Sequence, residues 1–260
     1  MMREKYSIRF ATKKDAPSIV YLVRTAFEKK YLIPSVYRGK GIDEFILGEL
    51  ENKFSRFKYF LICEKDEVIG CAEFKIYSND LTVFFSLLSI RNEYKSKGIG
   101  RNIFEHCMRY FLNEGFKSIE LDVYKTNCAA LNWYERFGYI KVDSQSFYRL
   151  RLETIAQSKN DIYIENYPQF KILHNKLGFS FLELAIQGKS FKFGVVENDL
   201  IIRGSYDSSV KQYLKYLCEM LKLENIYFIG NPSKFKELEF IDNIYRMKLN
   251  LDYDNKKSIK

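Results

Sequence analysis

The chain has 260 residues with a formal net charge of +9, and 47% of its residues are hydrophobic. This is enough apolar material for one large core or two smaller ones, and it argues against intrinsic disorder. The positive charge is spread along the sequence without a concentrated basic stripe, so a nucleic-acid surface is not favoured, whereas an anionic ligand fits.

Targeting segments and metal ligands are not indicated either. No apolar run approaches the roughly 20 residues that a membrane span needs, and residues 1–15 contain no apolar signal segment. The cysteines have neither metal-ligand nor CxxC spacing, and the chain has only two histidines. We therefore expect no metal, no membrane partner, and a cytoplasmic protein with reduced thiols. The cysteines are Cys63, Cys71, Cys107, Cys128 and Cys218.

The first ninety residues predict a strand, two helices and three more strands. Apolar residues alternate over residues 6–11, and the polar segment that follows, with Asp15 and Pro17, is typical of a helix start. A loop over residues 31–41, with a proline and two glycines, separates this helix from the next. The further strands are expected at residues 59–64, 68–76 and 81–90.

A glycine-bearing loop, K-S-K-G-I-G-R at residues 95–101, follows the last of these strands. After it, residues 103–111 place their apolar side chains at helical spacing. Gly98 and Gly100 allow backbone amides to approach an anion, and the three cationic side chains add charge. This order of strand, loop and helix start predicts a phosphate-binding site.

A second motif, N-C-A-A-L-N-W-Y-E-R-F-G-Y, occupies residues 127–139 after a predicted strand at residues 118–124. Ala130 and Tyr134 are four residues apart, so they share one face of a helix. Gly138 is expected to end that helix. A hairpin is predicted to follow at residues 139–142 and 146–152.

These two motifs resemble those of one family. The loop at residues 95–100 resembles the [Arg/Gln]-x-x-Gly-x-[Gly/Ala] loop of the GNAT acetyltransferases, with Lys95 in place of Arg or Gln. Residues 127–139 match the family's Asn-x-x-Ala-x-x-x-Tyr-x-x-x-Gly-[Phe/Tyr] segment at every named position. The resemblance covers about residues 6–153 and implies an α/β fold with a mixed sheet that binds acetyl-coenzyme A as cosubstrate. A smaller C-terminal α/β domain is expected at residues 154–260.

The resemblance also implies roles for individual residues. The glycine loop would grip the coenzyme pyrophosphate, while the strand before it would pair with the pantetheine as an extra strand. A strand amide would polarise the thioester carbonyl, and the Tyr134 hydroxyl would donate a proton to the leaving sulfur. The implied coenzyme-binding residues are Leu88, Ser89, Ile90, Lys95, Ser96, Lys97, Gly98, Ile99, Gly100, Arg101, Asn127, Ala130 and Tyr134.

The general base is less well indicated. Many family members carry a glutamate at the position that matches Ser86 here. Glu73 and Glu120 are the candidate bases, with Asp122 as a further choice, because they lie on neighbouring strands. Each is also compatible with a solvated carboxylate on a strand face. Without a base, the protein would take an amine of low pKa, use water, or have lost catalysis.

The C-terminal part is predicted to begin after a polar linker at residues 157–161. The pattern F-x-x-x-E-F at residues 235–240, with the strand-like residues after it, repeats that of residues 134–152. A degenerate second GNAT-like unit and an unrelated α/β domain are both consistent with this pattern. In either case residues 154–260 contain no Gly-x-Gly loop, so we expect no coenzyme site there. Predicted elements are strands at residues 179–186, 191–196, 200–203 and 226–229, a helix at 207–221, and a short helix with a hairpin over 235–249.

Two functions remain in view. The first is an acetyl-coenzyme A-dependent N-acetyltransferase that acts on a primary amine of a small molecule or peptide by direct attack in a ternary complex. The alternative is a non-catalytic acyl-coenzyme A-binding or scaffold protein with a partner-binding C-terminal domain. Both motifs favour the enzyme, and the acceptor and a homodimer are left open. We expect residues 154–260 to wall the acceptor cleft, and a chain ending near Glu153 to keep coenzyme binding.

Overall fold

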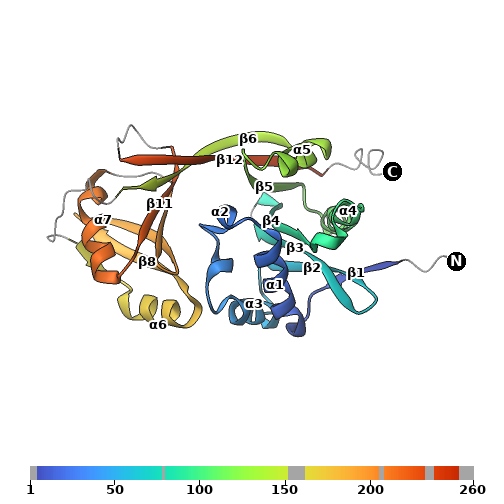
Figure 1. Cartoon of the computed structure of the whole chain (residues 1–260), viewed down its shortest axis with the longest axis horizontal. Coiled ribbons are helices and arrows are strands. Elements are labelled where there is room, and N and C mark those ends of the chain that lie inside the picture. Colours follow the sequence, from blue (N-terminus) through green and yellow to red (C-terminus); the bar gives the residue numbers. More distant parts are fainter. Residues whose placement is uncertain (1–4, 78–79, 152–161, 205–207, 232–236, 252–260) are drawn as a thin grey trace.

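A computed structural model describes residues 5–77, 80–151, 162–204, 208–231 and 237–251. Within these residues the strands form one twelve-stranded sheet in the order β1-β2-β3-β4-β5-β12-β6-β11-β10-β9-β8-β7. Figure 1 shows two lobes, which the long strands β6 and β12 bridge. We call β1–β5 with α1–α5 the first lobe, and β7–β11 with α6 and α7 the second lobe.

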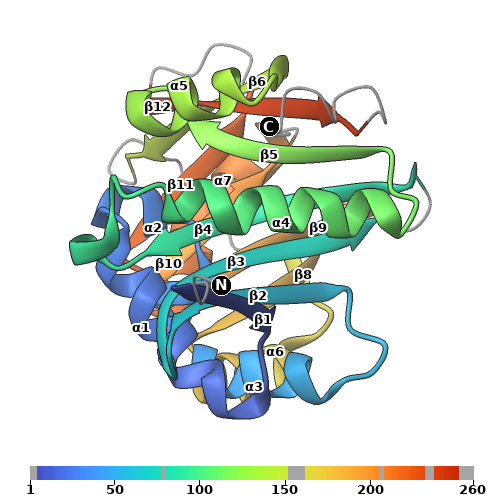
Figure 2. The same ribbon diagram turned by 90° about the vertical axis from the view of Figure 1, so that its right-hand side faces the viewer.

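Apart from the short helix α2, which was not predicted, the first lobe has the predicted order of elements. Helices α1 and α3 cover the face of the sheet turned toward the second lobe, and α4 crosses the opposite face (Figures 1 and 2). Its elements are β1 (Tyr6–Phe10), α1 (Ala16–Ala26), α2 (Lys29–Leu32), α3 (Ile42–Glu51), β2 (Phe57–Glu64), β3 (Glu67–Tyr77), β4 (Thr82–Ile90), α4 (Ile99–Asn113), β5 (Ser118–Tyr124) and α5 (Cys128–Arg136).

The second lobe repeats part of this order. The run β8-β9-β10-α7-β11 corresponds to β2-β3-β4-α4-β5, and in both runs the two strands that flank the helix are parallel. This supports the prediction of a second similar unit. Strand β7 and helix α6 were not predicted. The elements are β7 (Ile162–Ile164), α6 (Tyr167–Leu177), β8 (Phe179–Ile186), β9 (Lys189–Val196), β10 (Asp199–Arg203), α7 (Ser208–Leu221) and β11 (Asn225–Gly230).

The two lobes exchange strands. Strand β6 (Ile140–Leu150), which follows the first lobe in sequence, pairs with β11 of the second. Strand β12 (Leu238–Asn250), at the far end of the chain, returns to lie between β5 and β6. The predicted hairpins at residues 139–152 and in 235–249 are therefore wrong. The described residues of each segment form one long strand, β6 or β12, whose partners are distant in sequence. The predicted linker at residues 157–161 lies outside the described residues.

Side chains of the exchanged strands β6 and β12 are buried in the cores of both lobes. Met247 and Leu249 of β12 are buried with Phe104 of α4 in the first lobe. Leu150, at the end of β6, is buried with Leu214 of α7 in the second. Because burial of one such side chain contributes about 1.5–3 kcal/mol, each lobe depends on residues from the other half of the chain. Three strand pairs, β5 with β12, β12 with β6 and β6 with β11, thus cross the predicted boundary near residue 153.

All five cysteines are free thiols, as the sequence predicts, and Cys128 alone of them is exposed. None of the helices in the described ranges combines the length and apolar character that crossing a membrane requires.

Candidate active site

Strands β4 and β5 separate in the middle of the first lobe. Leu87 of β4 is opposite Glu73 of β3, while Phe85 is opposite Phe74, so Ser86 is an extra residue in a β-bulge. The parallel pairing of β4 with β5 extends only from Thr82 to Phe84. Beyond Phe84, the β5 side of β4 has no strand partner among the described residues, which leaves main-chain groups that an extended ligand can pair with.

The glycine loop lies at the start of α4, beside the end of β4 (Figure 2). Gly98 is the N-cap with a φ of +77°, a left-handed conformation that favours glycine, and no side chain caps the helix. The first hydrogen bond of the helix runs from the Asn102 amide to the Gly98 carbonyl at 3.0 Å. The amides of the first turn therefore point outward with no acceptor in the described part of the chain, as an anion site requires.

The charges at this loop are not equivalent. Lys95 and Lys97 are exposed. Arg101, by contrast, forms an ion pair with Glu105 at 2.7 Å and lies over the Phe137 ring. Neither lysine has a carboxylate partner among the residues described, although the Lys97 ammonium lies 5.4 Å from the centroid of the Tyr94 ring.

Helix α5 brings the second motif to the other side of the opening. The Asn127 side-chain oxygen accepts a hydrogen bond from the Ala130 amide at 3.3 Å, so it caps the helix. Tyr134 packs against Phe85, the residue before the bulge, with ring centroids 6.1 Å apart. Its hydroxyl has no hydrogen-bond partner among the described residues, and burial raises its pKa. Tyr134 is therefore a protonated, unoccupied donor beside the bulge at neutral pH.

Glu73 lies on the opposite face of the same region. It is only 6% exposed, and the Tyr37 hydroxyl donates to its Oε2 at 2.5 Å. Burial raises the pKa of Glu73, and hydrogen bonds from Tyr37 and then Ser86 oppose that rise. A carboxyl with a raised pKa is suited to accept a proton near neutral pH. Tyr37 could not be predicted from the sequence, because a tyrosine in a loop 36 residues before its partner has no local signal.

The other candidate carboxylates are in ion pairs with β12. Glu120 lies 3.4 Å from Arg246 and 3.3 Å from Lys248, measured between charged atoms. Asp122 is 2.5 Å from Arg246. In the described residues Glu73 has no such cationic partner, so its environment differs from that of Glu120 and Asp122.

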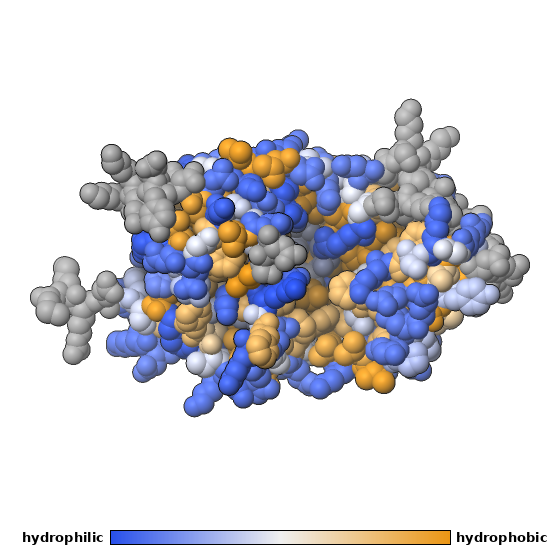
Figure 3. All heavy atoms as spheres, turned by 180° about the vertical axis from the view of Figure 1, so that it is seen from behind, coloured by the Kyte–Doolittle hydropathy of each residue, from blue (hydrophilic) through white to orange (hydrophobic). Residues whose placement is uncertain are grey.

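The second lobe lies against the loop over residues 31–41 and the start of α3. Phe179 of β8 packs on Phe45 with ring centroids 5.4 Å apart, and Arg203 of β10 donates to the Pro34 carbonyl at 3.5 Å. Burial by the surrounding protein lowers the pKa of the Arg203 guanidinium. Figure 3 shows the surface hollowed near its centre, between the lobes.

Comparison with known proteins gives three kinds of similarity. The model of the Acetyltransferase (GNAT) family matches residues 17–139. A Drosophila melanogaster protein, "Probable N-acetyltransferase san", is 30% identical over 115 residues, which are 43% of this chain and 60% of that protein. The Schizosaccharomyces pombe "N-alpha-acetyltransferase 30" is 25% identical over 116 residues, covering 39% and 77% of the two chains.

A solved structure resembles the whole chain. The "Tandem GNAT protein from the clavulanic acid biosynthesis pathway" matches with a TM-score of 0.66 and 9% identity, and the match covers 95% of this chain and 99% of that one. At this identity the match concerns the fold alone, which is a tandem of two similar units. The chain spans about 60% of the length of the Drosophila relative. An activity for this chain must therefore be argued from its own site, because a shared fold does not establish function.

Proposed function

We propose that the protein transfers an acetyl group from acetyl-coenzyme A to a primary amine, since residues 17–139 match the model of the Acetyltransferase (GNAT) family. The amine attacks the thioester directly in a ternary complex. The observation that carries this proposal is the pair of side chains at the Ser86 bulge. Glu73, a buried carboxyl, lies beside it on one face, and Tyr134, a protonated phenol, lies on the other.

The coenzyme would bind along the separated strands. Amides of residues 98–101 and the Lys95 and Lys97 side chains would hold the pyrophosphate, and the free side of β4 at residues 88–90 would pair with the pantetheine. Ser89 would contribute only its main chain, since its hydroxyl donates to the Leu22 carbonyl at 2.8 Å. The thioester would then lie near the bulge, where a β4 amide polarises its carbonyl.

Proton transfers follow from the two sides of the bulge. Glu73 accepts the proton of the attacking amine, directly or through one water, and Tyr134 donates to the departing thiolate. A phenol has a pKa near 10 and a thiol near 8.5, so transfer from Tyr134 is not obligatory for the thiolate to leave. Glu73 also places a carboxyl group beside Ser86, the position at which many family members carry their glutamate. For this reason the non-catalytic alternative is not favoured.

The acceptor class stays open. An amine would enter between the lobes, so we propose that the second lobe, with the loop over residues 31–41, walls its site. Free thiols throughout the chain favour a cytoplasmic location.

Release of free thiol from acetyl-coenzyme A, followed against a panel of amines, tests the proposal. The panel contains a polyamine, free amino acids, peptides with a free N-terminus, and N-acetylated peptides with a lysine. Thiol release with one class and not the others would identify the acceptor, and it should disappear in Glu73→Gln. If no class raises thiol release above the rate in buffer, while acetyl-coenzyme A still binds, the enzyme proposal is wrong and the binding protein is favoured.

A further inference from the structure

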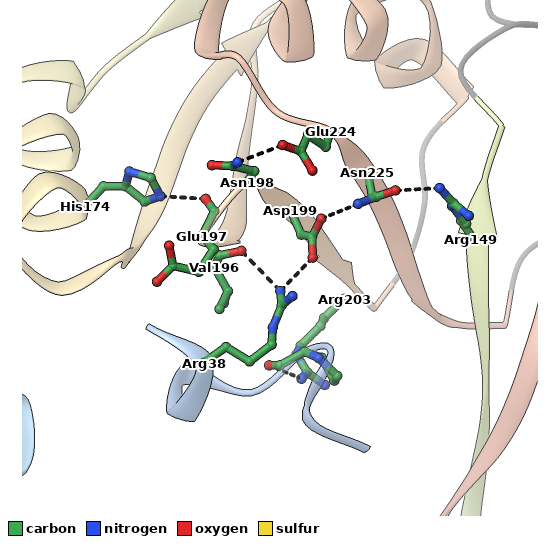
Figure 4. A network of polar contacts seen from close by, with 11 residues as sticks. Arg38, Arg149, His174, Val196, Glu197, Asn198, Asp199, Arg203, Glu224 and Asn225 are labelled. Carbon is green, nitrogen blue, oxygen red and sulfur yellow. Dashed lines mark hydrogen bonds and ion pairs between the residues drawn. The ribbon is translucent and has the colours of Figure 1, made fainter. Parts of the chain in front are cut away.

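The loop that carries Tyr37 is held from both lobes. Arg24 of α1 donates to the Tyr37 carbonyl at 2.8 Å, and Arg38 connects the loop to the second lobe. Tyr37 belongs to the short helix η2 (Val36–Arg38) and is 4% exposed. The next residue, Arg38, points away from the first lobe: its Nη2 lies 2.7 Å from Asp199 Oδ2 and 3.2 Å from the Val196 carbonyl oxygen. Figure 4 shows Arg38 reaching from this loop to the strands of the second lobe. Two adjacent residues therefore connect Glu73 and Asp199.

Burial and hydrogen bonds hold the Asp199 side chain in place. It is 5% exposed and begins β10, directly opposite Asn225 at the start of β11. Its second oxygen, Oδ1, accepts from Asn225 Nδ2 at 2.6 Å, and Asn225 in turn accepts from Arg149 of β6 at 2.6 Å (Figure 4). A buried carboxylate with both oxygens bonded has one orientation, so it can fix the guanidinium that faces it.

The backbone of the loop also fits closely against the second lobe. A Cβ on Gly39 would lie 2.5 Å from the Phe179 ring, and one on Gly41 would lie 2.6 Å from the Lys176 carbonyl oxygen. Neither glycine has a positive φ, so the requirement is for space and not for conformation. The Gly41 amide donates to the Leu177 carbonyl at 2.9 Å. The second lobe therefore approaches this loop too closely to be a loosely tethered cover.

We infer that Asp199, through Arg38, is a positioning residue that holds Tyr37 on Glu73, so that the second lobe sets the proton affinity of the proposed base. This inference rests on the proposed function only for the role of Glu73 as base. The contacts from Asp199 to Glu73 are those of the structure itself. The physical link is the hydrogen bond from the Tyr37 hydroxyl, which stabilises the ionised carboxylate.

Other groups face Glu73 and must be separated from this effect. Tyr59 of β2 and the Lys75 charge on β3 also favour its ionised form, and Cys71 lies close enough for the two groups to interact. None of these residues contacts Asp199 or Arg38 in the described hydrogen bonds and ion pairs. A change at Asp199 should therefore reach Glu73 through Tyr37 alone.

Infrared titration of the full-length protein tests the inference without any acceptor. The carboxyl band of Glu73 is assigned by difference against Glu73→Gln, and its midpoint is followed in each variant. Tyr37→Phe should raise the midpoint by about one pH unit, the effect of losing one hydrogen bond to a charged group. Asp199→Asn and Arg38→Gln should each raise it too. The double variant with Tyr37→Phe and Asp199→Asn should match Tyr37→Phe alone.

Glu183→Gln is the matched control, because it removes an exposed ion pair with Lys192 in the same lobe. It should leave the midpoint where it is in the wild type. The inference is overturned if Tyr37→Phe moves the midpoint while Asp199→Asn and Arg38→Gln do not. It is also overturned if neither Asp199→Asn nor Arg38→Gln folds, because the contact between Asp199 and Arg38 would then be needed for the fold in general. A missing acetyl transfer with normal shifts would refute the proposed function and leave the Asp199–Tyr37 link intact.

Discussion

Replacing Glu73 with Gln should abolish turnover and at the same time stabilise the fold at neutral and alkaline pH. The amide has the shape of the carboxyl and keeps an oxygen for the Tyr37 hydroxyl, 2.5 Å away in the wild type. It cannot accept a proton. Loss of a general base lowers kcat by roughly 10²- to 10⁴-fold, or about 3–5 kcal/mol of transition-state stabilisation.

The stability effect follows from burial. Burial raises the pKa of Glu73, so the folded state holds the proton at pH values where the unfolded chain has lost it. The stability due to this group is complete below the ordinary pKa of glutamate, near 4.3, and is lost as pH rises through the folded pKa, at about 1.4 kcal/mol per unit of difference. Gln has no such loss. The melting temperature of Glu73→Gln minus that of the wild type should therefore increase with pH.

The assay combines thiol release with melting curves between about pH 5 and pH 9. The melting shift caused by acetyl-coenzyme A should be the same in both proteins, which shows that the coenzyme site is intact. Turnover at the wild-type rate in Glu73→Gln would refute the role as base. A melting temperature that falls equally at all pH values would show that the carboxylate is a stabilising structural group.

Four further outcomes are expected. Gly98→Val should abolish the melting shift caused by acetyl-coenzyme A, whereas Gly115→Val, with an equally left-handed backbone and equally open surroundings, should lose a similar amount of stability and keep the shift. Tyr134→Phe should lower kcat about 10²-fold with nearly unchanged coenzyme affinity; a wild-type rate would mean that the ring only packs. Asp15→Asn should lower the free energy of unfolding at pH 7 by about 2 kcal/mol, because its hydrogen bonds to Arg9 lower the pKa of Asp15 to about 2. The wild type should lose that stability as pH falls from about 4 to 2, and acid denaturation curves that coincide would contradict this. A chain that ends before β12 should fail to fold, since β5 and β6 lose their shared partner; a folded, coenzyme-binding fragment would show that the first lobe is independent.

The sequence alone determined the local parts of this protein. The glycine loop and the segment from Asn127 to Tyr134 are short, and their conformations depend on neighbours three or four residues away. Most strand and helix positions were predicted for the same reason, because alternation and helical spacing are local patterns. The start of α4 at a left-handed Gly98 and the capping of α5 by Asn127 are consequences of those few residues.

The tertiary structure decided what depends on pairing across the chain. The register of β12 between β5 and β6 joins residues that are 88 to 132 positions apart, and an alternating strand pattern does not specify its partner. The sequence showed no acid at Ser86, yet Glu73 lies beside it, because adjacent strands bring residue 73 and the bulge together. Tyr37 and Asp199 likewise act on this site through contacts between distant segments. Such contacts form only when the whole sheet is assembled, because the sequence around each residue does not specify which distant residue it will contact.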